Sequence, residues 1–213
     1  GIYGGSYHIK DSEYDEFLTL YCKEILLSGK KEYLTEIQLK DGCSPILVDL
    51  DFRYDTSVTE RQHGEDFGTD VAEVYMEALN KVLKITPNTE FPVWIMEKDN
   101  AIVTEKCTKD GIHLIIGIAC DHTVQQLIRN EVIEQIGPLL DSLPLTNTKE
   151  DVLDASISTG NTGWQLYGSM KPGNIPYKIT NFMKCKMLEN GEFDSVPVEF
   201  EYENNIDILK SIC

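Results

Sequence analysis

The sequence predicts an α/β or α+β protein in which strands and helices alternate around a mixed sheet. Two kinds of segment predict it: short apolar stretches rich in β-branched residues, and longer stretches in which apolar residues recur every three or four positions. The third observation is their interleaving along 213 residues, a length sufficient for one large domain or two small lobes. The hydrophobic content of 41% is typical of a globular protein, and no apolar run approaches the about 20 residues of a membrane span.

Helices are predicted where apolar residues recur at helical spacing and end signals flank them. Ser12 is a candidate N-cap for the first helix, and Pro87 ends the second, which is strongly amphipathic. The third helix is expected to break near Gly137 and Pro138, because a proline inside a helix removes one hydrogen bond and clashes with the preceding turn. The predicted helices span residues 12–31, 65–87, 121–143 and 204–213.

Strands are predicted in short apolar segments that are bounded by turn residues. Two of them, 91–98 and 111–119, are separated by a charged loop of the hairpin type. Because the strands alternate with helices, we expect the sheet to have both parallel and antiparallel neighbours. The predicted strands span residues 46–52, 91–98, 111–119, 163–170 and 177–187.

The chain is strongly acidic, with 36 Asp and Glu against 19 Lys and Arg and a net charge of −17. This balance argues against non-specific nucleic-acid binding, which depends on basic residues that neutralise phosphates. A local basic groove could still form in the last predicted strand, which carries Lys178, Lys184 and Lys186. Lys184 and Lys186 share a face if this segment is a strand. The alternative is a solvated edge strand that its lysines protect.

Cysteine usage favours an intracellular protein. The six cysteines are scattered and form no C-x-x-C pair, so neither a disulfide framework nor a zinc ribbon is indicated. Cys107 with Cys120 and His122 could ligate zinc, although their spacing matches no known zinc motif. No signal peptide is visible, and a chain that starts with Gly1 is expected to be a fragment of a longer protein.

The segment ILVDLDFRY, residues 46–54, places two aspartates in a buried-looking strand. Asp49 and Asp51 are two residues apart, so both carboxylates point to the same face, and Arg53 continues that face. Two adjacent like charges repel and raise one pKa unless something offsets them. A divalent cation is the usual partner of such a pair, so this segment predicts a metal site.

A second polar row stands at the start of the strand GIHLIIGIA. Lys109, Gly111 and His113 are two apart and share a face, while Ile112 and Leu114 alternate with them toward the core. Lysine supplies a point charge, glycine lets a ligand approach the backbone, and histidine donates a hydrogen bond, which together suit a triphosphate. The alternative is a histidine whose hydrogen bonds are satisfied at the edge of a sheet.

A third acidic residue, Asp154, precedes a turn rich in Ser, Thr, Gly and Asn. The predicted strand after this turn ends in GSMKPG, which contains Lys171. Asp154 could complete a set of three carboxylates, and Lys171 could be a second phosphate contact. An aspartate before such a turn also serves as a cap or turn former, so both interpretations stay open.

In this order, the three segments resemble the motifs of the archaeo-eukaryotic primase superfamily: D-x-D on a strand, K-x-G-x-H on a strand, and an acid before a strand ending in G-S-x-K. The chain is most similar to the primase–polymerase domain of the primase–helicases of large nucleo-cytoplasmic DNA viruses, through YGGSYHI, KEYLTE, ILVDLDFRY, DGIHLIIG and WQLYGSMKP. The resemblance runs from about residue 3 to 187. It implies a two-lobed catalytic core, an N-terminal α/β unit plus an RNA-recognition-motif-like mixed sheet with flanking helices, with the metals in the cleft between the lobes. Residues 1–213 would form one catalytic domain of a longer chain.

The resemblance also implies roles for individual residues. Asp49, Asp51 and Asp154 match the catalytic acids, which bind two Mg²⁺ or Mn²⁺ ions without an organic cofactor. His113 and Lys171 match residues that contact the phosphates of the incoming nucleotide.

Other positions of the implied phosphate site depart from the family pattern. Lys109 and Gly111 precede the histidine, and Gly111 replaces a serine that is frequent in the family, so only its backbone can contact a ligand. Gln165 replaces an arginine of cellular relatives, which removes one bidentate cation from the triphosphate site. Arg53 or Ser169 could compensate for this loss.

The implied function is that of a template-directed nucleotidyltransferase, a DNA primase or DNA polymerase that makes primers or extends strands on single-stranded DNA. The expected substrates are ribo- or deoxynucleoside triphosphates, and the template is expected to cross the sheet near Lys184 and Lys186. The expected partner is a helicase domain in the same full-length chain, and no membrane partner is expected. The expected location is a virus replication compartment inside the host cell.

Three alternatives stay open. A catalytically weak or inactive primase-like scaffold would bind nucleic acid for a replicative helicase, and Gln165 in place of arginine supports it. A haloacid-dehalogenase-type phosphatase also has D-x-D after an apolar strand, but Arg53 stands where that class usually has Thr or Val, and no later acidic pair follows an apolar strand. A metal-dependent nuclease would need a water-activating Lys or Glu beside the acids, which is not visible.

Overall fold

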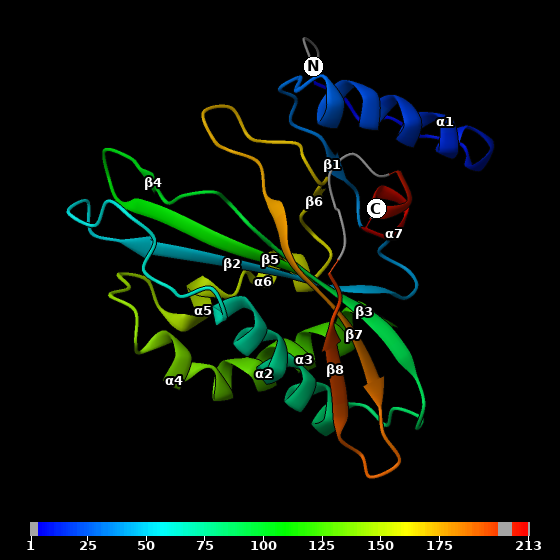
Figure 1. The fold of residues 1–213 in the computed structure, drawn as a ribbon, viewed down its shortest axis with the longest axis vertical. Helices are drawn as coiled ribbons and strands as arrows, with labels where there is room; N and C mark the ends of the chain where they lie inside the picture. Colours follow the sequence, from blue (N-terminus) through cyan, green and yellow to red (C-terminus); the bar gives the residue numbers. More distant parts are fainter. Residues whose placement is uncertain (1–3, 200–205, 213) are drawn as a thin grey trace.

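A six-stranded sheet forms the centre of the molecule in the computed structural model, which describes residues 4–199 and 206–212 (Figure 1). The strand order is β2-β5-β3-β7-β8, and the short strand β4 pairs with β5. Each of these pairings is antiparallel. The strands are β2 Ser44–Tyr54, β3 Glu90–Glu97, β4 Ile102–Val103, β5 Thr108–Cys120, β7 Lys178–Met187 and β8 Phe193–Pro197.

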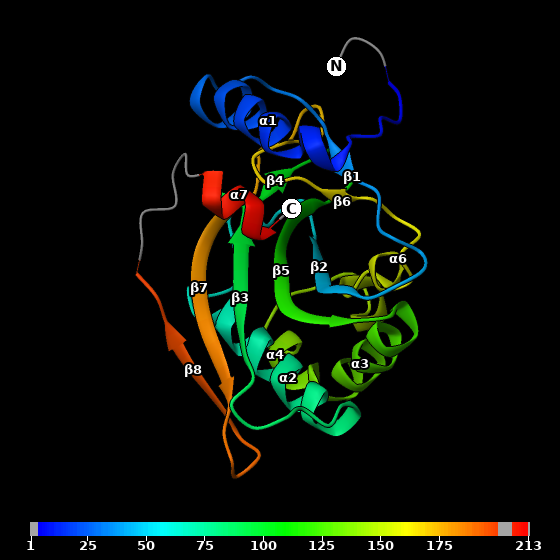
Figure 2. The same ribbon diagram turned by 90° about the vertical axis from the view of Figure 1, so that its right-hand side faces the viewer.

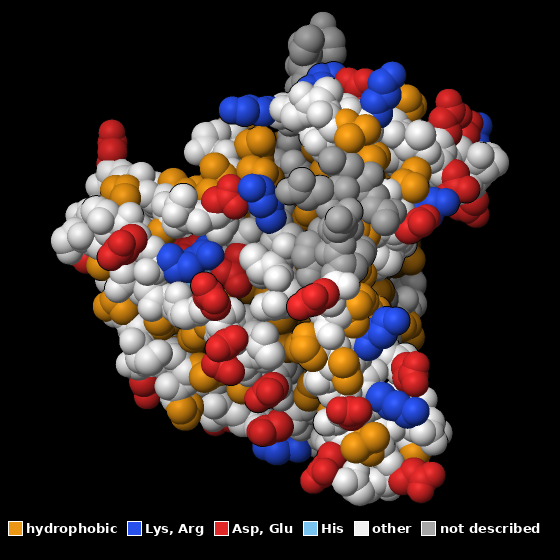
Figure 3. All heavy atoms as spheres, viewed as in Figure 1, with side chains coloured by type: hydrophobic (Ala, Val, Ile, Leu, Met, Phe, Trp, Pro, Cys, Tyr) orange, Lys and Arg blue, Asp and Glu red, His pale blue; other side chains and the backbone are white. Residues whose placement is uncertain are grey.

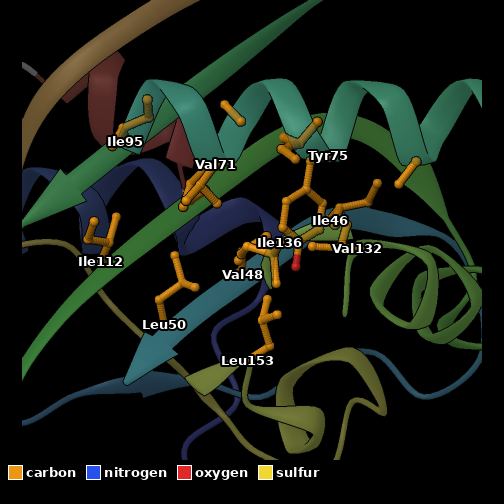
Figure 4. Close-up of a cluster of buried hydrophobic side chains, with 14 of the residues drawn as sticks. Ile46, Val48, Leu50, Val71, Tyr75, Ile95, Ile112, Val132, Ile136 and Leu153 are labelled. Carbon is orange, nitrogen blue, oxygen red and sulfur yellow. The ribbon is translucent and has the colours of Figure 1, made fainter. Parts of the chain in front are cut away.

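Helices α2, α3 and α4 cover one face of this sheet (Figures 1 and 2). Strand β2 supplies an apolar face for these helices to cover. Its even-numbered residues from Ile46 to Tyr54 are buried, while its odd-numbered residues stay at least partly accessible. Val71 and Tyr75 of α2 and Ile136 meet these buried side chains in the main core (Figure 4). Each such side chain stabilises the fold by about 1.5–3 kcal/mol when fully buried. The helices are α2 Phe67–Val82, α3 His122–Gln135 and α4 Gly137–Leu140.

The opposite face of the sheet carries a smaller unit that contains the first and last helices (Figure 2). Ile208 and Ile212 of the last helix belong to a hydrophobic cluster with Trp94 and Ile115 of the sheet and with Trp164. This smaller unit therefore covers the face on which Asp49 and His113 were predicted to lie. Its elements are α1 Asp11–Tyr21, the π-helix η1 Cys22–Leu27, β1 Thr35–Glu36, β6 Trp164–Gln165, which pairs with β1, and α7 Ile206–Ile212.

The predicted class, interleaved strands and helices with flanking helices on a sheet, is confirmed, but the sheet is antiparallel and not mixed. The predicted helix break is also confirmed, because α3 ends at Gln135 and α4 begins at Gly137. The strand predicted for 163–170 is wrong beyond Gln165. Gly168 there has a φ of 80°, a turn conformation that only glycine adopts without strain.

Several short elements have no counterpart in the predictions. They are β1, β4, β8 and the one-turn helices α5 Lys149–Val152 and α6 Ala155–Ser158. Tyr3 of the N-terminal motif and residues 204, 205 and 213 of the last predicted helix lie outside the described residues. Within the described residues, no helix combines the length and apolar character needed to cross a membrane.

Candidate active site

The first two predicted motifs face each other across strands β2 and β5. In the antiparallel register, Asp49 lies opposite His113, and Asp51 lies opposite Gly111. Arg53 pairs with Lys109 in the same way. The two motifs therefore form one polar row on the sheet face that points away from the main core. The resemblance had implied a site in a cleft between two lobes. Because β2 and β5 are neighbours in one sheet, this part of the site instead lies on a single sheet.

The third motif joins this row because residues 146–154 run along the free edge of β2. Thr146 donates its backbone N–H to the carbonyl of Arg53 at 2.8 Å. Further along, Leu153 forms a bridge with Leu50, and the Asp154 N–H donates to the Asp49 carbonyl at 3.0 Å. Arg129 of α3 holds this segment from the other side, since its Nε donates to the Leu153 carbonyl at 3.0 Å.

The Asp154 carboxylate also caps a helix. Its two oxygens accept hydrogen bonds from the backbone N–H of Ser156 at 2.8 Å and from the Ser156 hydroxyl at 2.9 Å, at the start of α6. The cap interpretation of Asp154 is therefore confirmed. The same residue is the backbone neighbour of Asp49, so capping and a place beside the acid pair are compatible.

The two aspartates of β2 differ in their electrostatic environment. Burial acts to raise the pKa of Asp49, but His113, whose Nε2 lies 3.3 Å from Asp49 Oδ1, and the positive charges of Lys171 and Lys98 bring this pKa below its ordinary value. The pKa of Asp51 is raised, first by burial and then by the negative charge of Asp49. At Asp49 the neighbouring His113 and the lysine charges therefore outweigh burial, whereas at Asp51 burial and the charge of Asp49 outweigh the same lysine charges.

The donor set suits a hard divalent cation. Asp49 Oδ1 is buried and has no hydrogen-bond partner among the described residues, although His113 Nε2 lies 3.3 Å away. A buried carboxylate oxygen without a donor is costly unless a cation binds it. Three carboxylates are also the oxygen ligands that Mg²⁺ and Mn²⁺ prefer. Among the residues that the structure describes, no three His, Cys, Asp or Glu side chains already converge as a complete metal cage.

His113 is held between two aromatic rings. The ring of Tyr177 stacks on the imidazole with a centroid distance of 3.6 Å and an interplanar angle of 20°. The ring of Trp164, from β6, lies 4.6 Å from the imidazole on a tilted plane. The imidazole is therefore fixed in orientation toward Asp49, and its environment is not that of a histidine at an open sheet edge.

Gly111 makes room for Tyr177. A Cβ atom at this position would lie 2.7 Å from the Leu50 carbonyl oxygen and 2.7 Å from the Tyr177 hydroxyl. In this structure the space beside the glycine therefore holds the tyrosine, and not a ligand that approaches the backbone.

We expect Gly111→Ala to lower the free energy of unfolding by about 1–3 kcal/mol, because the methyl group must displace a carbonyl or the stacked tyrosine. Urea denaturation followed by circular dichroism measures this loss. Gly64→Ala is the matched control, since a Cβ atom there meets no atom within 4 Å. Equal stability of Gly111→Ala and Gly64→Ala would contradict the packing role.

The predicted phosphate-binding residues separate into two groups. Lys109, Lys171 and Arg53 have exposed side chains, and the charge of Lys171 lowers the pKa of Asp49. Gln165 and Ser169 instead support the β1–β6 pair. The Gln165 amide donates to the Ser169 carbonyl at 2.7 Å, and the buried Ser169 hydroxyl donates to the Leu34 carbonyl at 2.9 Å. In this arrangement Ser169 is not available as the compensating phosphate contact.

The predicted template lysines lie on one face of β7. Lys184 is in register with Pro92 and Lys186 with Glu90, and Lys186 forms an ion pair with Glu90 at 3.5 Å. The edge-strand alternative is wrong, because β8 pairs with the outer side of β7. On the face shown in Figure 3, acidic side chains are spread widely and the described Lys and Arg side chains occur singly or in small groups.

The zinc alternative is also wrong. Both ring nitrogens of His122 lie within hydrogen-bond distance of backbone carbonyls, Nδ1 at 3.2 Å from Ser158 and Nε2 at 2.9 Å from Leu39. Within the described part of the chain, neither Cys107 nor Cys120 takes part in a group of three potential metal ligands.

A family model described as the C962R protein N-terminal AEP domain, where AEP denotes archaeo-eukaryotic primase, matches residues 1–183. The chain belongs to this family. An alignment of 186 positions, which covers 83% of this chain, is 29% identical to the protein named "Putative helicase L207/L206" of Acanthamoeba polyphaga mimivirus. This primase domain spans only 18% of that relative. The resemblance to the primase domain of viral primase–helicases is therefore confirmed.

Two residues of the primase domain were missed by sequence reasoning. Tyr177, which precedes β7, stacks on His113, and Lys98, which follows β3, lies 4.7 Å from the centroid of the Tyr177 ring. Both stand at an end of a predicted strand, 91–98 or 177–187, and just outside the strands of the structure. Lys98 continues the even-numbered face of β3, on which Met96 lies opposite His113, so alternation within the predicted strand 91–98 is the signal that could have found it.

Proposed function

We propose that this primase domain is a template-directed nucleotidyltransferase that makes primers or extends strands on single-stranded DNA. The observation that carries the proposal is the hydrogen bond from the Asp154 N–H to the Asp49 carbonyl at 3.0 Å. Asp154 thereby lies beside the D-x-D strand, on the side of β2 opposite to His113 of β5, and three such carboxylates are the kind of ligand that metal-dependent phosphoryl transfer uses. Membership of the AEP family supports the same activity.

The family generally uses divalent metals, and Asp49, Asp51 and Asp154 would hold them here. Bound Mg²⁺ or Mn²⁺ would lower the pKa of the attacking 3′-hydroxyl and neutralise charge on the triphosphate. The chain itself supplies orientation. His113, fixed by its stacking on Tyr177, keeps Asp49 ionised, and Lys171 attracts the phosphates. The proposed chemistry needs no covalent enzyme intermediate.

The proposed template path crosses the sheet face near Lys184 and Lys186. Both lysines lie on the same face of β7, and β3 lies between β7 and the polar row on β2 and β5. Because the net charge of the chain is −17, we propose that template binding depends on this local group and decreases steeply with salt.

The mimivirus relative is named a helicase, and this supports a helicase portion elsewhere in a longer chain. We propose that residues 1–213 act as one catalytic domain of such a primase–helicase in a virus-infected cell. Nucleoside triphosphates and single-stranded DNA are the proposed ligands.

We expect Asp154→Asn to reduce incorporation of labelled nucleotides on a single-stranded template by about 10²-fold or more, because one anionic ligand is lost. Asparagine still caps α6, so the thermal midpoint should change little. The assay is run with Mg²⁺ and with Mn²⁺, with ribo- and deoxynucleotides, and with pyrophosphate release as a second readout.

Asp121→Asn is the matched control, since Asp121 caps α3 through the Val124 N–H at 2.9 Å and lies outside the polar row. It should keep wild-type activity. Wild-type activity of Asp154→Asn would refute the catalytic role of this acid.

A second candidate function is a primase-like scaffold that binds single strands but incorporates no nucleotide. Gln165 favours it, because this residue stands where cellular relatives have arginine and its amide is used by the Ser169 carbonyl. The same assay separates the two, since a scaffold would bind single-stranded DNA and release no pyrophosphate.

A further inference from the structure

We propose that Lys98 is a phosphate-binding residue of this site and supplies the cation that Gln165 does not. The inference rests on the proposed nucleotidyltransferase function and adds to it a contact for the β- and γ-phosphates of the incoming nucleotide. Its basis is the position of Lys98 at the end of β3, beside the polar row of β2 and β5.

The register of the sheet places Lys98 on the face that carries the polar row of β2 and β5. Met96 lies opposite His113, so the face of β3 that carries Met96 is the face of the polar row. Lys98 is two residues further, beyond the last residue of β3, and its Nζ lies 4.7 Å from the centroid of the Tyr177 ring. The hydroxyl of that same ring lies beside Gly111, which is in register with Asp51. Lys98 is therefore next to the acid pair.

The backbone of Lys98 is held by a buried ionic network under the sheet. Arg61 donates from Nη2 to the Lys98 carbonyl at 2.6 Å. The same guanidinium donates to Glu97 at 2.7 Å and to Asp110 at 2.9 and 3.0 Å. Because Glu97 and Asp110 are 5% and 1% exposed, this clamp fixes the end of β3 against β5. The backbone from which the Lys98 side chain extends is therefore held in place.

The environment of the Lys98 ammonium group suits the binding of an anion. Its side chain is half-buried, and among the described residues no carboxylate lies within ion-pair distance of its Nζ. Burial lowers its pKa, while the more distant charges of Asp51 and Asp49 act to raise it. A half-buried ammonium group that faces an aromatic ring and contacts no carboxylate is stabilised when an anionic ligand binds it.

The alternative is a purely electrostatic role, in which Lys98 only offsets the negative charge of Asp49 and Asp51. The two roles differ in ligand dependence. A phosphate contact discriminates nucleoside triphosphate from monophosphate, whereas charge compensation affects the binding of both ligands alike, through the metal.

The test is a titration of wild type, Lys98→Gln and Lys98→Arg with a fluorescent nucleoside triphosphate and with the matching monophosphate, in Mn²⁺. We expect Lys98→Gln to weaken triphosphate binding by about tenfold or more and to leave monophosphate binding unchanged, with Lys98→Arg close to wild type. Lys81→Gln is the matched control, because Lys81 lies in the helical layer and forms an exposed ion pair with Glu131. Thermal midpoints confirm that each variant is folded.

An equal loss for both ligands, or no loss for either, would overturn the role of Lys98. If wild type incorporates nucleotides and Lys98→Gln binds triphosphate normally, only this inference fails. If wild type neither binds triphosphate nor incorporates it, the proposed function fails and this inference fails with it.

Discussion

Replacing Asp51 with Asn is expected to lower nucleotide incorporation by about 10²–10³-fold and, at the same time, to raise thermal stability at pH 7. The activity is lost because a metal-binding carboxylate becomes a neutral amide. The stability rises because burial and the neighbouring charges of Asp49 and Asp154 raise the pKa of Asp51, so its ionised form is unfavourable in the folded state.

The pH dependence of this gain has a defined sign. A carboxyl whose pKa is higher in the folded than in the unfolded chain destabilises the fold once the pH exceeds its unfolded value of about 4. The difference in thermal midpoint between Asp51→Asn and wild type should therefore be largest near neutral pH and decrease as the pH falls toward that value. Melting curves at several pH values measure it.

Asp55→Asn is the control, because hydrogen bonds from Ser57 lower the pKa of the exposed Asp55 and its neutralisation should bring no gain in stability. A midpoint of Asp51→Asn at or below that of wild type at pH 7 would contradict the electrostatic account.

Replacing Arg61 with Met is expected to lower the free energy of unfolding by about 3–5 kcal/mol, because it leaves two buried carboxylates without their cation. Arg61 contacts Glu97 at 2.7 Å and Asp110 at 2.9 Å, and the side chains of these acids are 5% and 0% exposed. Urea denaturation measures the loss. Adding Asp110→Asn to Arg61→Met should recover part of it, whereas Arg53→Met, at an exposed position, should change stability by less than about 0.5 kcal/mol. An unchanged urea midpoint for Arg61→Met would show that this network contributes little.

The polar row could be predicted from the sequence because it depends only on strand alternation. Asp49 and Asp51 were placed on one face by their spacing, and so were Lys109 and His113, and the register then set the two rows side by side. The approach of Asp154 could not be derived from spacing, because the segment that carries it pairs with the edge of β2 across about one hundred residues of chain. Only the order of motifs indicated it.

The rest of the site depends on irregular structure. A register shift between Ile95 and Met96 changes how β3 meets β7, and Tyr177 approaches His113 from a segment before β7 begins. Arg61 comes from a loop without apolar periodicity, so no pattern in the sequence connects it to Asp110. The family match identifies a primase domain and thereby argues against a haloacid-dehalogenase-type phosphatase, an alternative that composition and spacing alone had left open.

The central claim is that Asp49, Asp51 and Asp154 together hold divalent ions against a triphosphate. Electron paramagnetic resonance of free Mn²⁺, titrated with the protein and a non-hydrolysable nucleoside triphosphate, tests it most directly. We predict about two bound Mn²⁺ ions per wild-type chain and a clear loss of binding in Asp51→Asn and Asp154→Asn, with Asp121→Asn unchanged. Equal Mn²⁺ binding by wild type and by both site variants would contradict the claim.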